Sequence, residues 1–268
     1  AIIKDITSHL SSIGYSLEVI SSQPSYLKNT KVKKNFEIEY INNIKVNRLS
    51  LKNETGTFVR RIINSIKIGF FLLYKSIFNK YDLLIVTSIP PILGGFFGIL
   101  ASKLSNTKLI YFCMDIHPEI GILSNDYTNN IFFKILQKID SFNCHNSDIV
   151  LVHSEDMKNT LKNRIGFKKS NIFIMNNFAK TPKKFSKNNH SFSKKNENNF
   201  KIIYTGNIGR FQCLDEIVNS MIQLKNHKKI ELVIIGEGVL KEKLKKLIHK
   251  NNVNIKLLNY MPENEIFN

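Results

Sequence analysis

The chain has 268 residues, 43% of them hydrophobic, and carries a net charge of +18 from 39 lysines and arginines against 21 aspartates and glutamates. This apolar content excludes a disordered protein, and the length suffices for two domains of ordinary size. Three cysteines without pairing or metal-ligand spacing exclude a disulfide scaffold and fit a reducing cytosol.

The positive charge favours an anionic partner, such as a phospholipid surface, nucleotide phosphates or a nucleic acid. A composition inflated in lysine, asparagine and isoleucine explains the charge equally well, because the lysines are spread along the chain. Nucleic-acid binding needs basic residues interleaved with aromatics on one face, and no known module of that kind is present. We therefore expect no nucleic-acid partner.

At the N-terminus, apolar residues recur at helical spacing from Ile2 to Ile13. The strand that opens an α/β domain would precede such a helix. At the other end, residues 261–265 read as a loop entering a helix that does not follow. We therefore expect the chain to be a fragment of a longer protein, inactive or nearly so.

Short apolar runs alternate with helical patterns through the first half of the chain. The apolar runs predict buried strands. The predicted strands are 16–20, 83–86, 109–113, 149–152 and 171–175, and the predicted helices between them include 131–142 and 156–163. Strands 36–40 and 44–48 alternate with a period of two around Asn42 and Asn43, which predicts a hairpin. The alternation of β and α elements predicts a doubly wound parallel sheet.

Residues 62–78 form the most hydrophobic segment of the chain. Lys67 and Lys75 interrupt it, and it is too short and too polar for a membrane span. The pattern favours a buried or groove-lining helix over an interfacial membrane helix.

Residues 178–199 break the alternation. They are rich in lysine, asparagine and serine and include Pro182, a composition typical of a linker or mobile loop. The alternation then restarts with strands 201–204, 231–235 and 253–258 and helices 215–224 and 240–248. We expect an N-terminal domain over residues 1–177, a linker or mobile loop over 178–199, and a partial C-terminal domain over 200–268.

Two glycine turns follow strands of the C-terminal domain. The first contains Gly206, Asn207, Gly209 and Arg210, and the second contains Gly236, Glu237 and Gly238. A strand, a glycine turn and a helix in succession place backbone N–H groups and a helix N-terminus where an anion can bind. Neither turn matches the full dinucleotide fingerprint, but the pair predicts a nucleotide-phosphate site.

Two charged residues of these turns have alternative roles. Arg210 could grip a diphosphate with two hydrogen bonds, or it could be a solvated surface residue. Glu237 could accept hydrogen bonds from ribose hydroxyls, or it could cap the helix that starts near Leu240.

A second candidate site lies where strands of the N-terminal domain end. Asp115 follows a buried strand, at the edge where doubly wound sheets bind ligands; it and Glu119 could instead cap the next segment. For His117 the pattern favours a structural role. Thr87 and Ser88 end another strand, where a ligand could approach, although helix initiation is slightly favoured. No metal-ligand cluster, Walker turn or Gly-x-Ser-x-Gly motif is present in the sequence.

These motifs resemble the family-4 retaining glycosyltransferases of the GT-B fold, in particular the bacterial subgroup that builds capsular and O-antigen polysaccharide. The matching segments run in family order along essentially the whole chain: residues 24–26, 81–82, 87–91, 115–119, 147–152, 174–177, 204–210 and 235–238. Asp-x-x-Pro-Glu at 115–119 and Gly-Asn-x-Gly-Arg at 206–210 are specific to the subgroup.

The resemblance implies two Rossmann-like domains facing a cleft and a reaction without metal or cofactor. It places Asp115 at the reacting sugar as the catalytic residue. It assigns the nucleotide-sugar donor to Gly206, Asn207, Gly209, Arg210, Gly236, Glu237 and Gly238, and the acceptor side to Thr87, Ser88, His117 and Glu119.

Three departures from the family pattern stand out. Asn207 replaces an arginine after the first glycine, and Gln212 and Cys213 replace a later Lys-Gly pair. His117 stands where tryptophan is common. The paired-glutamate segment of the family would lie after Asn268.

We expect a hexose-type sugar to be transferred to a lipid-linked glycan at the cytoplasmic face of the membrane, with an anionic membrane surface as a further partner. A nucleotide-sugar 2-epimerase of the same architecture is an alternative. A non-catalytic basic module that binds membrane or nucleic acid is the other.

Overall fold

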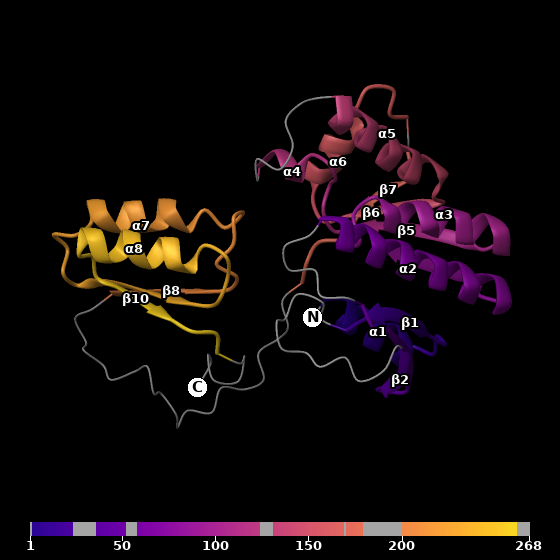
Figure 1. Cartoon of the computed structure of the whole chain (residues 1–268), viewed down its shortest axis with the longest axis horizontal. Coiled ribbons are helices and arrows are strands. Elements are labelled where there is room, and N and C mark those ends of the chain that lie inside the picture. Colours follow the sequence, from indigo (N-terminus) through magenta and orange to yellow (C-terminus); the bar gives the residue numbers. More distant parts are fainter. Residues whose placement is uncertain are drawn as a thin grey trace. The chain divides into compact units, whose positions relative to one another are not determined.

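The computed structural model describes residues 2–23, 36–51, 58–123, 131–168, 170–178 and 200–261. The chain divides into two compact units, Ala1–Ala179 and Lys180–Asn268, which are drawn in Figure 1. Three segments named from the sequence lie outside the described residues: positions 24–26, positions 262–265 and all of the expected linker except Phe178.

The first unit begins with helix α1 (Ile2–Ser12) and a three-stranded sheet of order β1-β3-β2. Strand β1 (Glu18–Ser22) is parallel to β3 (Ile44–Leu49), and β2 (Phe36–Ile41) is antiparallel to it. The predicted hairpin is therefore confirmed. Asn42 and Asn43 both have a positive φ at its turn, a backbone conformation that asparagine tolerates better than most residues.

Glu18 ties this sheet to the rest of the unit. Its carboxylate accepts hydrogen bonds from Lys75 Nζ at 2.9 Å, from Asn47 Nδ2 at 2.7 Å and from Tyr81 Oη at 2.6 Å. Burial alone would raise the pKa of Glu18, but these donors outweigh it and lower the pKa to about 2. The partners come from β3, from helix α2 (Phe58–Phe78) and from the residues before β4.

The low pKa of Glu18 makes the stability of the first unit depend on pH. Since this pKa is lower in the folded chain than in the unfolded chain, the ionised carboxylate stabilises the fold above the ordinary glutamate pKa of 4.5, and the contribution is lost as the pH falls towards about 2. We expect Glu18→Gln to cost about 1–2 kcal/mol at neutral pH. Urea unfolding across the acid range should give a flatter stability curve for the variant; parallel curves would contradict this role.

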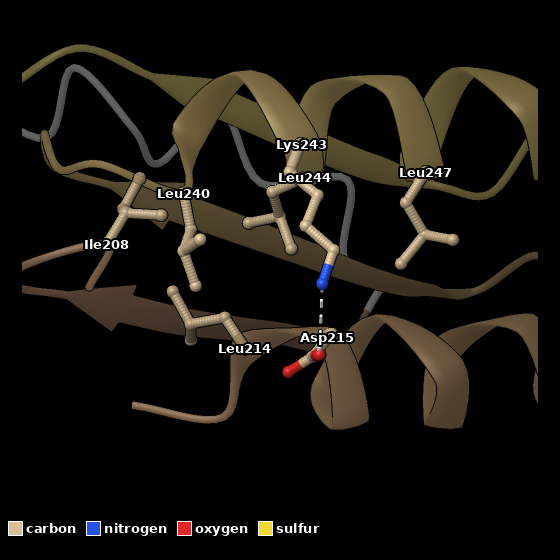
Figure 2. Close-up of a pocket in the computed structure, with 7 residues that line it drawn as sticks. All are labelled: Ile208, Leu214, Asp215, Leu240, Lys243, Leu244 and Leu247. Atoms are coloured by element: carbon tan, nitrogen blue, oxygen red, sulfur yellow. Dashed lines mark ion pairs between the residues drawn. The ribbon is translucent and has the colours of Figure 1, made fainter. Parts of the chain in front are cut away.

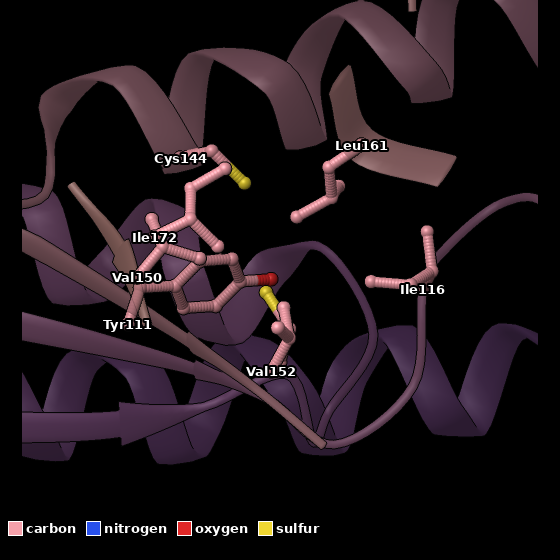
Figure 3. Packing of buried hydrophobic residues seen from close by; sticks show 8 residues of the cluster. Tyr111, Ile116, Cys144, Val150, Val152, Leu161 and Ile172 are labelled. Atoms are coloured by element: carbon pink, nitrogen blue, oxygen red, sulfur yellow. The ribbon is translucent and has the colours of Figure 1, made fainter. Parts of the chain in front are cut away.

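The second sheet of this unit is parallel throughout, with the order β4-β5-β6-β7. Its strands are β4 (Leu83–Thr87), β5 (Lys108–Cys113), β6 (Ile149–Val152) and β7 (Ile172–Ile174). The helices that alternate with them are α3 (Leu93–Ser105), α4 (Ile120–Leu123), α5 (Ile131–Asn146) and α6 (Glu155–Lys162). Figure 3 shows the core on one side of this sheet, where the ring of Tyr111 lies among Cys144, Val150, Val152 and Ile172.

Helix α2 exposes large apolar residues along one side. They are 37% to 63% exposed: Val59, Ile63, Ile66, Phe70, Tyr74 and Ile77. The prediction that this segment is buried or lines a groove is therefore wrong along that side. Elsewhere on the helix, Gly69 packs so closely on Phe97 of α3 that a Cβ atom would lie 2.2 Å from the ring. None of the helices in the described ranges could span a membrane.

The predicted parallel sheet of the first unit is present in β4 to β7, and the hairpin belongs to a separate sheet. The described strands form two sheets, because β3 takes β1 and β2 as its neighbours and β4 pairs only with β5. Strand β4 is consequently an edge strand, and its Leu83 and Ile85 are exposed, whereas the sequence had predicted a buried strand.

Between residues 200 and 261, the described part of the second unit, the chain forms a parallel sheet of order β10-β9-β8 and two helices. The strands are β8 (Phe200–Thr205), β9 (Ile230–Ile235) and β10 (Ile255–Leu258), and the helices are α7 (Leu214–Gln223) and α8 (Lys241–Asn251). Both helices lie on the same face of the sheet in Figure 1. Leu214, Val218 and Leu244 pack there against Leu232 and Ile234 of the central strand. The predicted restart of the βα alternation from residue 200 onwards is confirmed.

Candidate functional site

Two loops at the carboxyl edge of the parallel sheet in the first unit are joined by Ser88. This residue is buried, and its backbone N–H donates to Phe112 O at 2.9 Å. Its Oγ accepts hydrogen bonds from the backbone N–H groups of Met114 at 3.0 Å and Asp115 at 3.2 Å. Ser88 therefore fixes the backbone of Asp115, and its buried position suits this role better than direct contact with a ligand. Thr87, beside it, bonds within its own turn to Ile89.

Asp115 is half-buried at the end of β5, where the sequence placed it. Within the described part of the chain its carboxylate has no hydrogen bond or ion pair, and it caps no helix: Ile120 N–H, at the start of α4, donates instead to the backbone oxygen of Ile116. The alternative role as a helix cap therefore has no support in the described contacts.

The loop that follows Asp115 is bound by the side chain of Arg164, which is only 2% exposed. Its guanidinium donates to both carboxylate oxygens of Glu119, at 2.8 and 2.7 Å, and to the backbone oxygen of His117 at 2.7 Å. It also donates to Asp140 Oδ2 at 2.8 Å. The other oxygen of Asp140 accepts from Tyr111 Oη at 2.9 Å. A buried arginine between two carboxylates thus sets the position of the 115–119 loop.

Burial and this network together set the pKa values of two residues predicted for the acceptor side, Glu119 and His117. Burial raises the pKa of Glu119, but the hydrogen bonds and the positive charge of Arg164 outweigh it, so the pKa lies below its usual value. Burial lowers the pKa of His117, against the opposing effect of Asp115. Glu119 is therefore an anion engaged inside the protein, and His117 is neutral at pH 7.

Arg164 and Asp140 were not predicted from the sequence. One signal was available: only five of the 39 basic residues are arginines. In a chain that uses lysine almost everywhere, an arginine marks a place where the planar, five-donor guanidinium is needed. Asp140 offered no such signal, because it lies within an ordinary amphipathic helix.

The two glycine turns of the second unit lie side by side at the carboxyl ends of β8 and β9. Gly206 N–H donates to Ile235 O at 3.0 Å, and Ile208 N–H donates to Glu237 O at 2.8 Å. A Cβ atom on Gly236 would lie 1.9 Å from Gly206 O, and one on Gly238 would lie 2.2 Å from Ile208 O. Glycine is required at 236 and 238 because two backbones touch there.

The hydrogen bonds between the two turns leave fewer backbone N–H groups for the predicted phosphate site. The amides of Gly206 and Ile208 are engaged with the second turn, and that of Gly209 donates to Gln212 Oε1 at 3.1 Å. Helix α7 starts only at Leu214 and carries Asp215 and Glu216 in its first turn, and these carboxylates already occupy the positive end of the helix dipole. In this structure, positive charge at the edge comes from side chains rather than from these amides.

Two basic side chains stand at this edge. Arg210 is exposed, as is Asn207 in the same turn. Lys241 Nζ donates to Gly236 O at 3.0 Å, to Glu237 Oε1 at 2.6 Å and to Asn259 Oδ1 at 2.8 Å. The hydrogen bond from Lys241 lowers the pKa of Glu237. Glu237 does not cap α8, so that alternative is wrong; it is held by Lys241 with its carboxylate exposed.

A small pocket in the second unit lies between its two helices and reaches the first glycine turn only through Ile208. Figure 2 shows it between α7 and α8, lined by Leu214, Leu240, Leu244, Leu247 and Ile208, with Lys243 Nζ 3.9 Å from Asp215 Oδ2. Its volume is about 20 Å³, room for about one water molecule. It is a packing gap between helices and adds nothing to the candidate site. No metal-binding group of three or more His, Cys, Asp or Glu residues occurs in the part of the chain that the structure describes.

Comparison with known proteins points to one family. Residues 185–268 match the family model described as "Glycosyl transferases group 1". A curated relative, the "Probable glycosyltransferase WbjE" of Pseudomonas aeruginosa, is 28% identical over 176 residues, which make up 63% of this chain and 42% of that protein. The chain thus spans less than half of that relative's length.

Solved structures show the same architecture at low identity. The sucrose-phosphate synthase of Thermosynechococcus elongatus matches with a TM-score of 0.72 and 12% identity, over 98% of this chain and 65% of that one. The structure titled "Trehalose-6-phosphate from E. coli bound with UDP-2-fluoro glucose" matches with a TM-score of 0.66 and 12% identity, over 97% and 70%. Both matches concern the fold, which is α/β with two Rossmann-like domains.

Proposed function

We propose that this chain is a group 1 glycosyltransferase that transfers a sugar from a nucleotide-sugar donor to a lipid-linked glycan acceptor with retention of configuration. The match of residues 185–268 to that family and the GT-B fold of the chain support the proposal. The setting is the synthesis of a cell-surface polysaccharide at the inner face of the cell membrane. A similar protein named as a probable glycosyltransferase and a fold match bound to a UDP-sugar analogue support the donor class.

The observation that carries the proposal is the pair of glycine turns in mutual contact at the carboxyl edge of β8 and β9. Ligands of open α/β sheets bind outside the carboxyl ends of the strands. The contact between Gly236 and Gly206 brings Arg210 and Glu237 to one edge. A guanidinium there suits a diphosphate and an exposed carboxylate suits ribose hydroxyls.

The chemistry asked of these residues is electrostatic. Transfer of the sugar leaves a nucleoside diphosphate that gains negative charge as the bond to the sugar breaks. Arg210 stabilises that charge as it develops, and positive groups already in place lower the barrier. Asp115, held by Ser88 on one side and by the Arg164 network on the other, acts at the sugar and acceptor.

The proposal is tested by calorimetric titration of the purified chain with UDP-glucose, UDP and uridine. Binding of UDP-glucose and UDP, with weak or no binding of uridine, is expected. A chain that binds none of them but binds unrelated nucleic acid in a salt-sensitive way would support the basic binding module instead. Conversion of a UDP-sugar to its 2-epimer without an acceptor would support the epimerase.

Arg210→Ala is expected to weaken UDP binding by about 1.5–3 kcal/mol, the scale of a charge-assisted hydrogen bond. Uridine binding should barely change, since it offers no phosphate. Lys228→Ala is the matched control: Lys228 is exposed in the same unit and precedes β9, at the opposite edge of the sheet. Equal losses for UDP and uridine in the Arg210 variant would show that Arg210 does not contact phosphate.

In an active form of the protein, Asp115→Asn is expected to lower kcat and kcat/KM together by about 100-fold or more while leaving donor affinity nearly unchanged. The reason is that Asp115 belongs to the first unit, whereas phosphate recognition is assigned to the second. Asp82→Asn, before β4 at the other edge of the same sheet, serves as the control. A folded Asp115 variant with normal kcat would show that Asp115 is not a catalytic residue.

A further inference from the structure

Lys241 is the first residue of α8, a position that is electrostatically unfavourable for a lysine. The N-terminus of a helix carries a partial positive charge, and acidic residues are the ones that stabilise it. The side chain of Lys241 is nevertheless only 14% exposed, whereas most lysine side chains are solvated. The contacts of its ammonium group therefore account for its position.

The ammonium group joins the ends of two strands at the carboxyl edge of the sheet. Lys241 Nζ donates to Gly236 O at 3.0 Å, to Glu237 Oε1 at 2.6 Å and to Asn259 Oδ1 at 2.8 Å. Leu258 O lies further away, at 3.4 Å. Gly236 and Glu237 follow β9, and Leu258 ends β10. An ammonium group has three N–H donors, so these contacts leave none for a ligand.

The same contacts fix one oxygen of the Glu237 carboxylate and leave the other open. Oε1 accepts from Lys241 and, at 3.4 Å, from Tyr260 N–H. Oε2 has no hydrogen-bond partner within the described ranges, and the side chain is 57% exposed. Because the hydrogen bond from Lys241 lowers the pKa of Glu237, the carboxylate is ionised at neutral pH and only accepts hydrogen bonds.

The backbone of Glu237 is fixed as well, by the first glycine turn. Glu237 O accepts from Ile208 N–H at 2.8 Å. Gly236 and Gly238, on either side of it, touch that turn so closely that neither position has room for a Cβ atom. Since the backbone and one carboxylate oxygen are both held, little rotamer freedom is left to lose when a ligand binds. Glu237 is a preorganised hydrogen-bond acceptor at the edge where open α/β sheets bind ligands.

The part of a nucleoside diphosphate that suits this oxygen is the ribose. A carboxylate repels phosphate, whereas ribose hydroxyls and base N–H groups can donate to it. The contact between Gly236 and Gly206 brings Glu237 to the same edge as Arg210, the residue proposed to bind the diphosphate. Ribose is bonded directly to the diphosphate and the base is not, so the hydroxyls of ribose are the nearer donors.

We propose that Lys241 is a positioning residue that holds Oε1 of Glu237 and leaves Oε2 to accept hydrogen bonds from the 2′- and 3′-hydroxyls of ribose. The site therefore prefers ribonucleotide sugars, such as UDP-sugars, to 2′-deoxyribonucleotide sugars, such as dTDP-sugars, because deoxyribose lacks one of the two donors. This inference rests on the proposed function, which assigns the nucleotide-sugar to this edge, and adds which nucleotides the site accepts.

Calorimetric titration of the chain with UDP and 2′-deoxy-UDP measures this contact directly. The dissociation constant of 2′-deoxy-UDP divided by that of UDP, called here the hydroxyl ratio, is expected to be about ten, the loss for one hydrogen bond to a charged group. A hydroxyl ratio near one in a chain that binds UDP overturns this inference alone. A chain that binds neither UDP nor UDP-glucose overturns the proposed function, and this inference with it.

Lys241→Met removes the ammonium group and keeps much of the side-chain volume. UDP is expected to bind about tenfold more weakly and 2′-deoxy-UDP nearly as before, so the hydroxyl ratio falls towards one. Lys243→Met is the matched control, because Lys243 lies two residues further along the same helix with its side chain 70% exposed; its ratio should not change. Equal weakening of both ligands in the Lys241 variant would mean that Lys241 binds phosphate or only stabilises the fold, and either result overturns the positioning role.

Glu237→Ala tests the ribose contact even if Lys241→Met fails to fold, since the side chain it removes is exposed. Its hydroxyl ratio should also fall towards one; equal weakening of both ligands would place the carboxylate at the base and contradict the proposal. The double variant Glu237→Ala/Lys241→Met should bind UDP as Glu237→Ala does, because Lys241 acts through Glu237. Additive losses would show that Lys241 acts independently of Glu237 and would overturn its positioning role.

Discussion

Gly236→Ala is expected to destabilise the second unit by about 3 kcal/mol or more, the upper range for overpacking a rigid site. The added methyl group would lie 1.9 Å from the backbone oxygen of Gly206. Backbone atoms cannot swing aside as a side chain can, so the two turns must separate. That separation would also break the hydrogen bonds from Gly206 to Ile235 and from Ile208 to Glu237.

Gly209→Ala, in the first glycine turn, is the matched control. Its methyl group would meet only the ends of two side chains, Asn207 Nδ2 at 2.6 Å and Gln212 Oε1 at 2.7 Å, which can rotate away. We expect a loss of about 1 kcal/mol or less there. Hydrogen exchange of β8 and β9 in urea measures the stability of this unit separately from the first. Similar losses in the two variants would show that the turns are not locked together.

The second large effect is expected for Arg164→Met, at about 3–5 kcal/mol. Removing the guanidinium leaves Asp140 and Glu119 as buried or half-buried carboxylates without their cation, and leaves the backbone oxygen of His117 without its donor. Methionine fills much of the same volume, so the loss reports mainly on charge and hydrogen bonding rather than on a cavity.

Lys108→Met is the control for this prediction. Lys108 forms an ion pair with Asp148 at 3.0 Å, but its side chain is 77% exposed. Exposed pairs of this kind contribute about 0–1 kcal/mol. Thermal and urea unfolding of both variants measure the difference. If Arg164→Met were as mild as Lys108→Met, the buried network would not be what holds the 115–119 loop.

The order and type of most elements could be predicted from the sequence, because both depend on local periodicity. The hairpin around Asn42 and Asn43, the strands of the parallel sheets and helices α5 to α8 follow from alternating or helical spacing of apolar residues. The N-cap of α6 is equally local: the side chain of Ser154 accepts a hydrogen bond from Met157 N–H at 3.2 Å.

Pairing partners and side-chain environments depended on tertiary structure. The division of the first unit into two sheets reflects which strand edges meet, and periodicity says nothing about that. The contacts of Ser88 and Glu119 are decided in the same way. Ser88 is used by Met114 and Asp115, and Glu119 is used by Arg164, which lies 45 residues further along the chain.

The sequence by itself determined the alternation of strands and helices, the two glycine turns and the place of Asp115 at a strand end, since each follows from residues close together in the chain. Only the tertiary structure decided why Gly236 and Gly238 must be glycines, because the backbone that excludes a side chain belongs to the other turn. It also decided which side of α2 faces solvent, because Phe97 and Glu18 from distant elements fix the helix rotation. Contacts between distant segments leave no periodic trace in a sequence.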